Sequence, residues 1–129
     1  MTKVSLVKGV GGMLDFRYYS FSKKCILLII LFSKIADNAY DVLLCSAGMF
    51  PGSITPQAFT ELIRVVKQGG VIAWNIADGY EGFNEFFKTY DEIYKQLIKD
   101  GKWEEIQPVK KMDNMLFEDA GYTYVMRKL

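Results

Sequence analysis

Two short apolar runs joined by a helical pattern constrain the fold of this chain more than any other feature. Tyr40–Ser46 reads YDVLLCS and residues 71–76 read VIAWNI, and runs of this length and composition are typical of buried strands. Between them, Thr55 can cap a helix and Pro56 suits its first position. Apolar residues then recur at helical spacing before a glycine stop: Phe59, Leu62, Ile63 and Val66, with Lys67 in the last turn and Gly69-Gly70 after it. Because parallel strands need such a crossover, the segment predicts a right-handed β-α-β unit.

The residues that follow extend this unit into an α/β domain. The spacing of large apolar residues predicts a long amphipathic helix over residues 83–98, which Gly101 ends. We expect a short strand at residues 102–106, a polar loop at 108–114 and a final strand at 122–127. The apolar face of the long helix should cover the sheet with Phe83, Phe86, Phe87, Tyr90, Ile93, Tyr94, Leu97 and Ile98.

The first 35 residues lack this regular succession of apolar segments separated by Gly and Pro. Residues 3–7 could form a short strand, and the glycines at 9–12 predict an ordinary flexible loop. Residues 16–21 are aromatic without a clear period. Residues 26–32 are continuously apolar, which favours a buried strand, although a short helix fits the same pattern.

Composition removes several classes of function. The chain has 129 residues with 16 basic and 15 acidic side chains, so charge gives no case for nucleic acid or an anionic membrane as a partner. It has no His, which excludes His-based triads, Cys/His zinc sites and the commonest general base. Cys25 and Cys45 lie in apolar runs and are expected to be buried, reduced thiols. The apolar run at residues 25–32 is far shorter than the roughly 20 residues of a membrane helix and fits a signal peptide poorly, so we expect a cytoplasmic protein.

Three stretches carry a resemblance to a known class of enzyme. The strand YDVLLCS at Tyr40–Ser46 is followed by MFPG at residues 49–52 and by FTELIRVVKQGG at residues 59–70. This succession resembles class I S-adenosylmethionine (SAM)-dependent methyltransferases, in which a YDVV strand precedes a helix that ends in a Lys-Pro-Gly-Gly turn. Gln68 replaces the usual Pro here. Within the class, the chain is most similar to the Williams–Beuren-region methyltransferase-like family, through GVIAWNI at residues 70–76 and GKWE at residues 101–104.

The resemblance covers about residues 36–129 and implies the second half of a methyltransferase domain, after an N-terminal segment (1–35) that does not resemble the family. It implies SAM as cofactor and an unknown methyl acceptor. By resemblance, the end of the first strand would border the methionine part of SAM or the acceptor, through Cys45, Ser46, Ala47, Gly48 and Met49. On the alternative interpretation, Cys45 belongs to the core and Ser46-Ala47-Gly48 is a connecting turn.

The family also implies a Gly-x-Gly-x-Gly loop and a ribose-binding acid in its first half. The chain offers only the cluster at residues 9–12, a weak signal, and Asp15 follows too soon to be that acid. Methyl transfer from a sulfonium depends chiefly on alignment, so a missing His is compatible with the class, and no residue is named as catalytic or as a metal ligand.

For the other polar and aromatic candidates, a structural role is an alternative to a functional one. Asp41 starts its strand and is expected to be structural, whereas Asp78 could contact a substrate or simply form an Asp-Gly turn. Trp74 and Trp103 are expected in the core rather than as a ligand-stacking pair, and Glu104-Glu105 on a solvated edge.

These observations lead to one expected architecture and two alternative functions. We expect a Rossmann-like, three-layer α/β half-domain with a mostly parallel sheet and a final antiparallel strand. Residues 26–32, with residues 3–7, should cover the edge of the strand Tyr40–Ser46, and any exposed edge would permit self-association. The first function is a SAM-dependent methyltransferase that lacks its glycine-rich half and is inactive alone. The alternative is a non-catalytic interaction or regulatory module.

Overall fold

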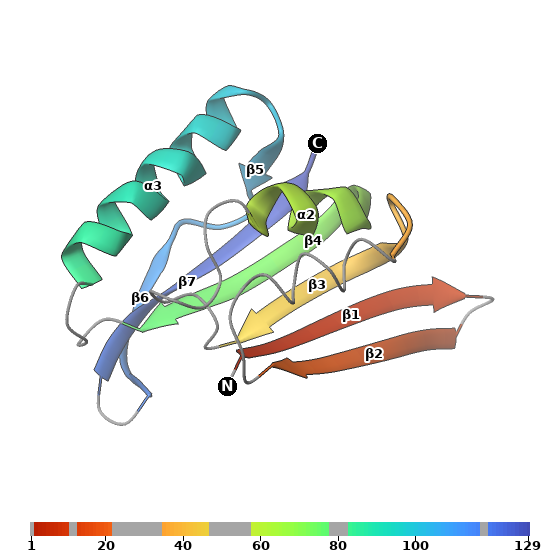
Figure 1. Cartoon of the computed structure of the whole chain (residues 1–129), viewed down its shortest axis with the longest axis horizontal. Coiled ribbons are helices and arrows are strands. Elements are labelled where there is room, and N and C mark those ends of the chain that lie inside the picture. The colour runs from red at the N-terminus through yellow and green to blue at the C-terminus, as the bar shows by residue number, and fades with distance from the viewer. Residues whose placement is uncertain (1, 11–12, 22–34, 47–57, 78–82, 117–118) are drawn as a thin grey trace.

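The computed structural model describes residues 2–10, 13–21, 35–46, 58–77, 83–116 and 119–129. Seven strands form a single sheet, and two helices lie along it (Figure 1). In chain order the elements are β1 (Thr2–Val10), β2 (Met13–Phe21), β3 (Tyr40–Ser46), α2 (Ala58–Val65), β4 (Val66–Ala77), α3 (Phe83–Lys99), β5 (Trp103–Glu105), β6 (Lys110–Leu116) and β7 (Asp119–Lys128).

The sheet mixes parallel and antiparallel strands in the order β2-β1-β3-β4-β7-β5, with β6 also paired to β7. Strand β3 is parallel to β4, as the β-α-β pattern predicts. The other described pairings are antiparallel, so the expectation of a mostly parallel sheet is wrong. Two of these pairings have a local reason: few residues join β1 to β2 and β6 to β7, and strands joined in this way run in opposite directions. The pairings of β1 with β3 and of β7 with β4 and β5 join strands far apart in the chain. The chain is therefore an α/β protein with a mixed sheet.

Helix α2 ends earlier than the sequence indicates. Its last residue is Val65, whereas Gly69-Gly70 was expected to stop it. The turn before β3 explains the difference, because the Asn38 and Ala39 amides donate to the carbonyls of Arg64 and Val65, each at 2.9 Å. Asn38 reaches this position with a left-handed φ of 53°, which Asn tolerates well.

The two glycines shape the start of β4 instead. The register with β3 jumps from the pair Tyr40–Val66 to the pair Val42–Val71, so β4 bulges between them. A Cβ on Gly70 would lie 2.7 Å from the Asp41 carbonyl oxygen and 2.5 Å from Val66 Cγ1. Any side chain at this position would force β3 and β4 apart.

The N-terminal hairpin covers the edge of β3. Strand β1 is antiparallel to β3, with Lys3 opposite Ser46 and Val7 opposite Val42, which confirms the edge-covering role expected for residues 3–7. The strand is longer than expected and includes Gly9, and the aromatic stretch at 16–21 belongs to β2. The other expected covering segment, residues 26–32, lies outside the described residues.

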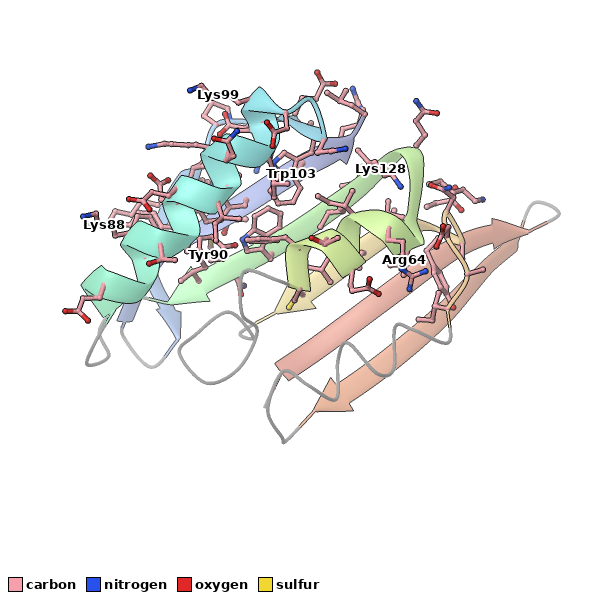
Figure 2. All side chains as sticks on the ribbon, turned by 45° about the horizontal axis from the view of Figure 1, so that its top comes forward. Arg64, Lys88, Tyr90, Lys99, Trp103 and Lys128 are labelled. Atoms are coloured by element: carbon pink, nitrogen blue, oxygen red, sulfur yellow. The ribbon has the colours of Figure 1, made fainter. Side chains whose placement is uncertain are left out.

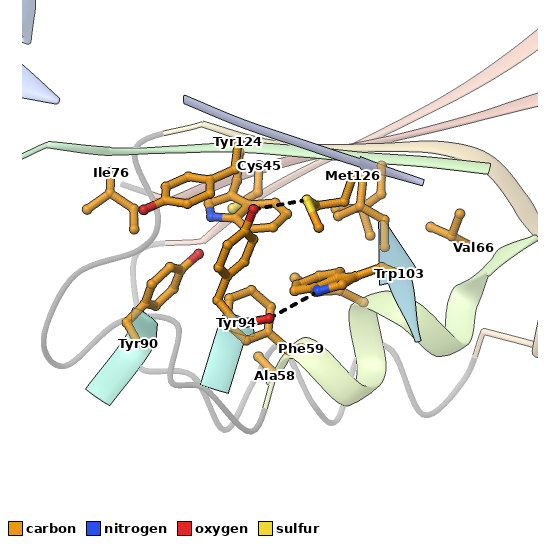
Figure 3. Packing of buried hydrophobic residues seen from close by; sticks show 14 of the residues in the cluster. Cys45, Ala58, Phe59, Val66, Ile76, Tyr90, Tyr94, Trp103, Tyr124 and Met126 are labelled. Atoms are coloured by element: carbon orange, nitrogen blue, oxygen red, sulfur yellow. Dashed lines mark hydrogen bonds between the residues drawn. The ribbon is translucent and has the colours of Figure 1, made fainter. Parts of the chain in front are cut away.

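Both helices lie on the same face of the sheet. Phe59 of α2 and Tyr94 of α3 each contact Trp74 of β4, with ring centroids 5.4 Å and 6.2 Å apart. Figure 3 shows Phe59, Tyr94 and Trp103 meeting between the helices and the strands. This helix-covered face holds a single core of Leu43, Cys45, Ala58, Phe59, Leu62, Val65, Val66, Ile72, Trp74, Ile76, Tyr90, Tyr94, Trp103, Tyr124 and Met126. Together with the sheet, the described helices make two layers, and a third layer stays a prediction.

One expected loop is a strand. Residues 110–114, expected in a polar loop over 108–114, belong to β6, which pairs with the first half of β7. Lys, Asp and Asn disfavour strands, so only pairing with β7 accounts for this conformation.

Candidate functional site

The carboxyl ends of β3 and β4 form the expected site region. Cys45 lies beside Trp74 in the parallel register, and β7 continues the surface with Tyr124 opposite Trp74. A shallow pocket of about 170 Å³ lies near these ends on the sheet face away from α2 and α3, lined by Leu44, Cys45, Ala73, Trp74, Asn75 and Thr123. Open α/β sheets bind ligands in crevices outside the carboxyl ends of parallel strands, and this pocket lies beside those ends on the face of the sheet.

The five residues expected to border the cofactor have different outcomes. Cys45 lines the pocket, but its side chain is 2% exposed and it belongs to the core as a free thiol. Ser46 is the last residue of β3 and pairs with Lys3 of β1. Ala47, Gly48 and Met49 lie outside the described residues. Of the two interpretations of Cys45, the described contacts support the core position.

The pocket is small for the expected cofactor. Ligand sites usually have volumes of about 300–1,000 Å³ and bury most of the ligand. The described residues here enclose about 170 Å³. These residues alone therefore do not form an enclosed SAM site.

Gly9 of the N-terminal hairpin lies at the wrong end of the sheet to complete such a site. Because β1 is antiparallel to β3, its first residues lie beside Ser46, whereas Val7 lies beside Val42. Gly9 follows Val7 and so lies near the start of β3, away from its carboxyl end. A cofactor loop must meet the carboxyl end, so Gly9 is not placed to take part in one. Gly9 lies in β1 and not in the expected loop, and residues 11–12 lie outside the described residues.

The two tryptophans belong to an aromatic core. Trp74 stacks on Trp103 at 5.2 Å with an interplanar angle of 23° and on Tyr124 at 5.1 Å and 4°. Trp74 and Trp103 are 2% and 0% exposed, and the Trp103 indole donates to the Tyr94 carbonyl oxygen at 3.4 Å. The expectation that both pack in the core is confirmed, because neither ring has a face open to a ligand.

The tyrosines beside these rings are weak candidates for proton transfer. Burial is the largest cause that raises the pKa of Tyr90, Tyr94 and Tyr124 above the usual value of 10.0. Tyr94 also donates its hydroxyl proton to the carboxylate of Glu105, which raises its pKa further. All three hydroxyls therefore stay protonated near neutral pH, and none can serve there as a general base.

The outer surfaces of the helices carry solvated charge. Figure 2 shows Lys88 and Lys99 pointing away from the sheet, whereas Tyr90 and Trp103 lie between α3 and the strands. Glu104 and Glu105 are exposed, as expected, and Arg127 lies 3.6 Å from Glu104. These contacts are typical of a protein surface and do not converge on the pocket.

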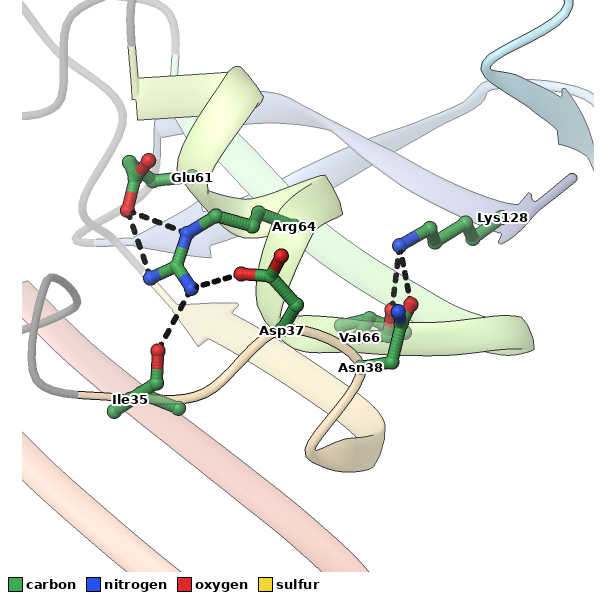
Figure 4. Close-up of polar contacts among 7 residues, drawn as sticks. All are labelled: Ile35, Asp37, Asn38, Glu61, Arg64, Val66 and Lys128. Atoms are coloured by element: carbon green, nitrogen blue, oxygen red, sulfur yellow. Dashed lines mark hydrogen bonds and ion pairs between the residues drawn. The ribbon is translucent and has the colours of Figure 1, made fainter.

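A second polar cluster lies at the opposite end of β3. Arg64 of α2 donates to Asp37 Oδ1 and to the Ile35 carbonyl oxygen, both at 2.7 Å, and also binds Glu61 (Figure 4). The hydrogen bond to Asp37 is the largest cause that raises the pKa of Arg64. The contacts tie the segment before β3 to α2, which is a structural role.

Two further contacts complete this end of the sheet. Lys128 binds Asn38 Oδ1 at 2.8 Å and the Val66 carbonyl oxygen at 2.9 Å. Asp41 pairs with Lys67 at 3.3 Å, in agreement with its expected structural role. The sequence could reveal the Glu61–Arg64 spacing within one helix turn, but not the distant partners, which only the fold brings together. The other polar candidate, Asp78, lies outside the described residues.

Three further findings do not indicate a particular function. Within the described ranges, no three Cys, Asp or Glu side chains cluster to hold a metal ion. Neither α2 nor α3 has the length and apolar character of a membrane-crossing helix. No protein-family model matches the chain, and no curated protein sequence matches it.

Proposed function

We propose that this chain carries the second half of a class I SAM-dependent methyltransferase domain and does not transfer methyl groups by itself. Its ancestry would be that of a Rossmann-like enzyme. Its own residues supply one border of a cofactor site and not the whole site.

One observation supports the methyltransferase ancestry. Strand β7, the last in the chain, lies antiparallel between β4 and β5. Strand β5 therefore runs in the same direction as β3 and β4, and one reversed strand interrupts a parallel set. The resemblance implies such a final antiparallel strand after a β-α-β unit, and here both features occur together.

The position of the β1–β2 hairpin supports the lack of turnover. The resemblance would place the glycine-rich half of the domain beside β3, and β1 occupies that edge in the antiparallel direction. The same observation favours a second candidate, a non-catalytic interaction module. In that case the hairpin would serve to complete the sheet and to present its own outer edge.

Calorimetric titration of the purified chain with SAM and with S-adenosylhomocysteine tests the proposal. We expect no binding up to millimolar concentrations, from a protein whose circular dichroism shows it to be folded. Binding in the micromolar range would overturn the proposal, because the chain would then complete a cofactor site with its own residues.

A pair of variants locates any binding that is observed. Ala73→Leu would fill the pocket beside Cys45, whereas Val71→Leu adds bulk two residues earlier on the same face of β4, outside the pocket. Micromolar affinity that Ala73→Leu weakens and Val71→Leu preserves would place the ligand in this pocket, beside Leu44 and Asn75. Affinity that both variants preserve would place it elsewhere.

A further inference from the structure

The two edges of the described sheet differ in how well they resist pairing with another strand. At one edge, β7 is flanked by β5 and β6, which are separate short strands with Pro108 between them and Lys110 and Lys111 at the start of β6. Short segments, Pro and Lys are the usual features that block edge-to-edge association.

The other edge is one continuous strand without Pro or Lys, and its only charged residues are Asp15 and Arg17. Strand β2 is nine residues long and reads MLDFRYYSF. It pairs along its whole length with β1 and ends the strand order of the described sheet. Every second residue of such a strand directs its backbone N–H and C=O away from β1, and none of the strands in the described ranges pairs there, so the outer side of β2 offers a continuous template for one more strand.

The sequence of β2 is complementary to itself. In an antiparallel pair of two copies centred on Phe16, Asp15 of each copy lies opposite Arg17 of the other, which gives two opposite-charge pairs around the centre. Beyond them, Leu14 lies opposite Tyr18 and Met13 opposite Tyr19. Each copy contributes the same residues, as a two-fold symmetric interface requires.

Neighbouring registers lack this complementarity. Centring the pair on Asp15 would place two carboxylates opposite each other, and centring it on Arg17 would do the same with two guanidinium groups. A shift by half a step places Asp15 opposite Phe16 or Tyr18, so neither charge meets its opposite. We infer that a second copy of this chain pairs with the outer edge of β2, antiparallel and centred on Phe16, and joins two sheets into one.

The test uses two charge-reversal variants, each of which should dimerise poorly alone, whereas a mixture of the two should form a dimer. Asp15→Arg makes both charges of the strand positive, and Arg17→Asp makes both negative, so each variant opposes its own dimer. Mixed in equal amounts, the two variants restore both opposite-charge pairs. By sedimentation equilibrium we expect a dimer for the wild type, self-association weakened roughly tenfold or more for each variant, and a one-to-one dimer for the mixture.

One variant needs a control for folding within the chain. Asp15 also lies opposite Lys8 in the hairpin, so Asp15→Arg is made together with Lys8→Glu to keep an opposite-charge pair there. Arg17 lies opposite Leu6 and needs no such compensation. Near-ultraviolet circular dichroism of the aromatic core then checks that each variant keeps the wild-type fold.

Three results would overturn the inference. A wild type that stays monomeric would exclude the dimer, and folded variants that dimerise as well as the wild type would exclude this register. A mixture that stays monomeric would show that the charge pairs do not form. None of these results depends on SAM binding, so the inference and the proposed function fail separately.

Discussion

The two faces of the sheet both carry apolar residues and have different surroundings. Leu43 and Leu44 are adjacent in β3, yet Leu43 is fully buried and Leu44 is 42% exposed. The same alternation continues in β4, where Ile72 and Trp74 are buried and Ala73 between them is partly exposed. Because α2 and α3 both lie over one face, that face becomes the core.

The other face, which we call the open face, mixes apolar with polar residues and is not a core, since Asn75 lies opposite Thr123 there. Leu44 lies opposite Ala73, and Ala73 lies opposite Val125, so these residues share that face. The contrast teaches that apolar strand residues mark a buried position only where a helix covers them. A continuous run such as VLLC does not reveal which of its residues a helix will cover.

The largest expected effect comes from the centre of the helix-covered face. Trp103→Ala should lower the free energy of unfolding by about 3–5 kcal/mol, because it removes a fully buried ring that Trp74, Tyr94 and Phe59 surround. Urea unfolding followed by circular dichroism measures the change. Ile106→Ala, which truncates a side chain that is 42% exposed, should change stability by less than about 1 kcal/mol. Equal losses in the two variants would contradict the assignment of the core.

The adjacent leucines provide the most direct comparison of the two faces. Leu43→Ala should cost about 2–5 kcal/mol, because it leaves a cavity under the helices. Leu44→Ala should cost less than about 1 kcal/mol, because solvent already reaches that side chain. The same urea experiment measures both. A loss at Leu44 as large as at Leu43 would show that the open face is covered.

A smaller effect is expected from the Tyr94 hydroxyl on the helix-covered face. Tyr94→Phe should cost about 1 kcal/mol at neutral pH, because it removes the hydrogen bond to Glu105. Since burial and Glu105 raise the pKa of Tyr94, the folded state keeps a proton that the unfolded state releases above about pH 10. Wild-type stability should therefore be intact below that pH and fall above it, and Tyr94→Phe should fall less steeply.

A matched variant separates the two causes of this pH dependence. Glu105→Gln removes the negative charge and keeps a hydrogen-bond acceptor for the Tyr94 hydroxyl. Because burial is the first cause, we expect Glu105→Gln to retain most of the alkaline loss, measured by unfolding at a series of pH values. If Tyr94→Phe loses stability above pH 10 as steeply as the wild type, Tyr94 is not the group responsible.

Sequence patterns predicted the helices and strands whose formation depends on residues close together in the chain. The spacing of Tyr90 and Tyr94 predicted α3 and its buried face, and YDVLLCS and VIAWNI predicted β3 and the inner part of β4. The end of α2 was wrong because Asn38 and Ala39, distant in sequence from Val65, satisfy its last carbonyls. Strand β6 was missed for a similar reason, since its polar residues become a strand only beside β7.

The candidate site could be predicted only in part. The position of Cys45 at the end of β3 followed from the strand pattern, but its burial depends on β4 and β7 beside it. The interactions of Arg64 with Ile35 and Asp37 left no signal in the sequence, because they join residues far apart in the chain.

By itself, the sequence determined the fold class of the protein. Apolar periods, the lack of His and the near balance of charge are properties of the chain in any conformation, and they led to an α/β domain with no evident base or metal site. Only the tertiary structure decided the direction of β1 and the face that the helices cover. Hydrogen bonds between strands can form in either direction, and both faces of a strand can be apolar, so these choices depend on long-range contacts that no local pattern contains.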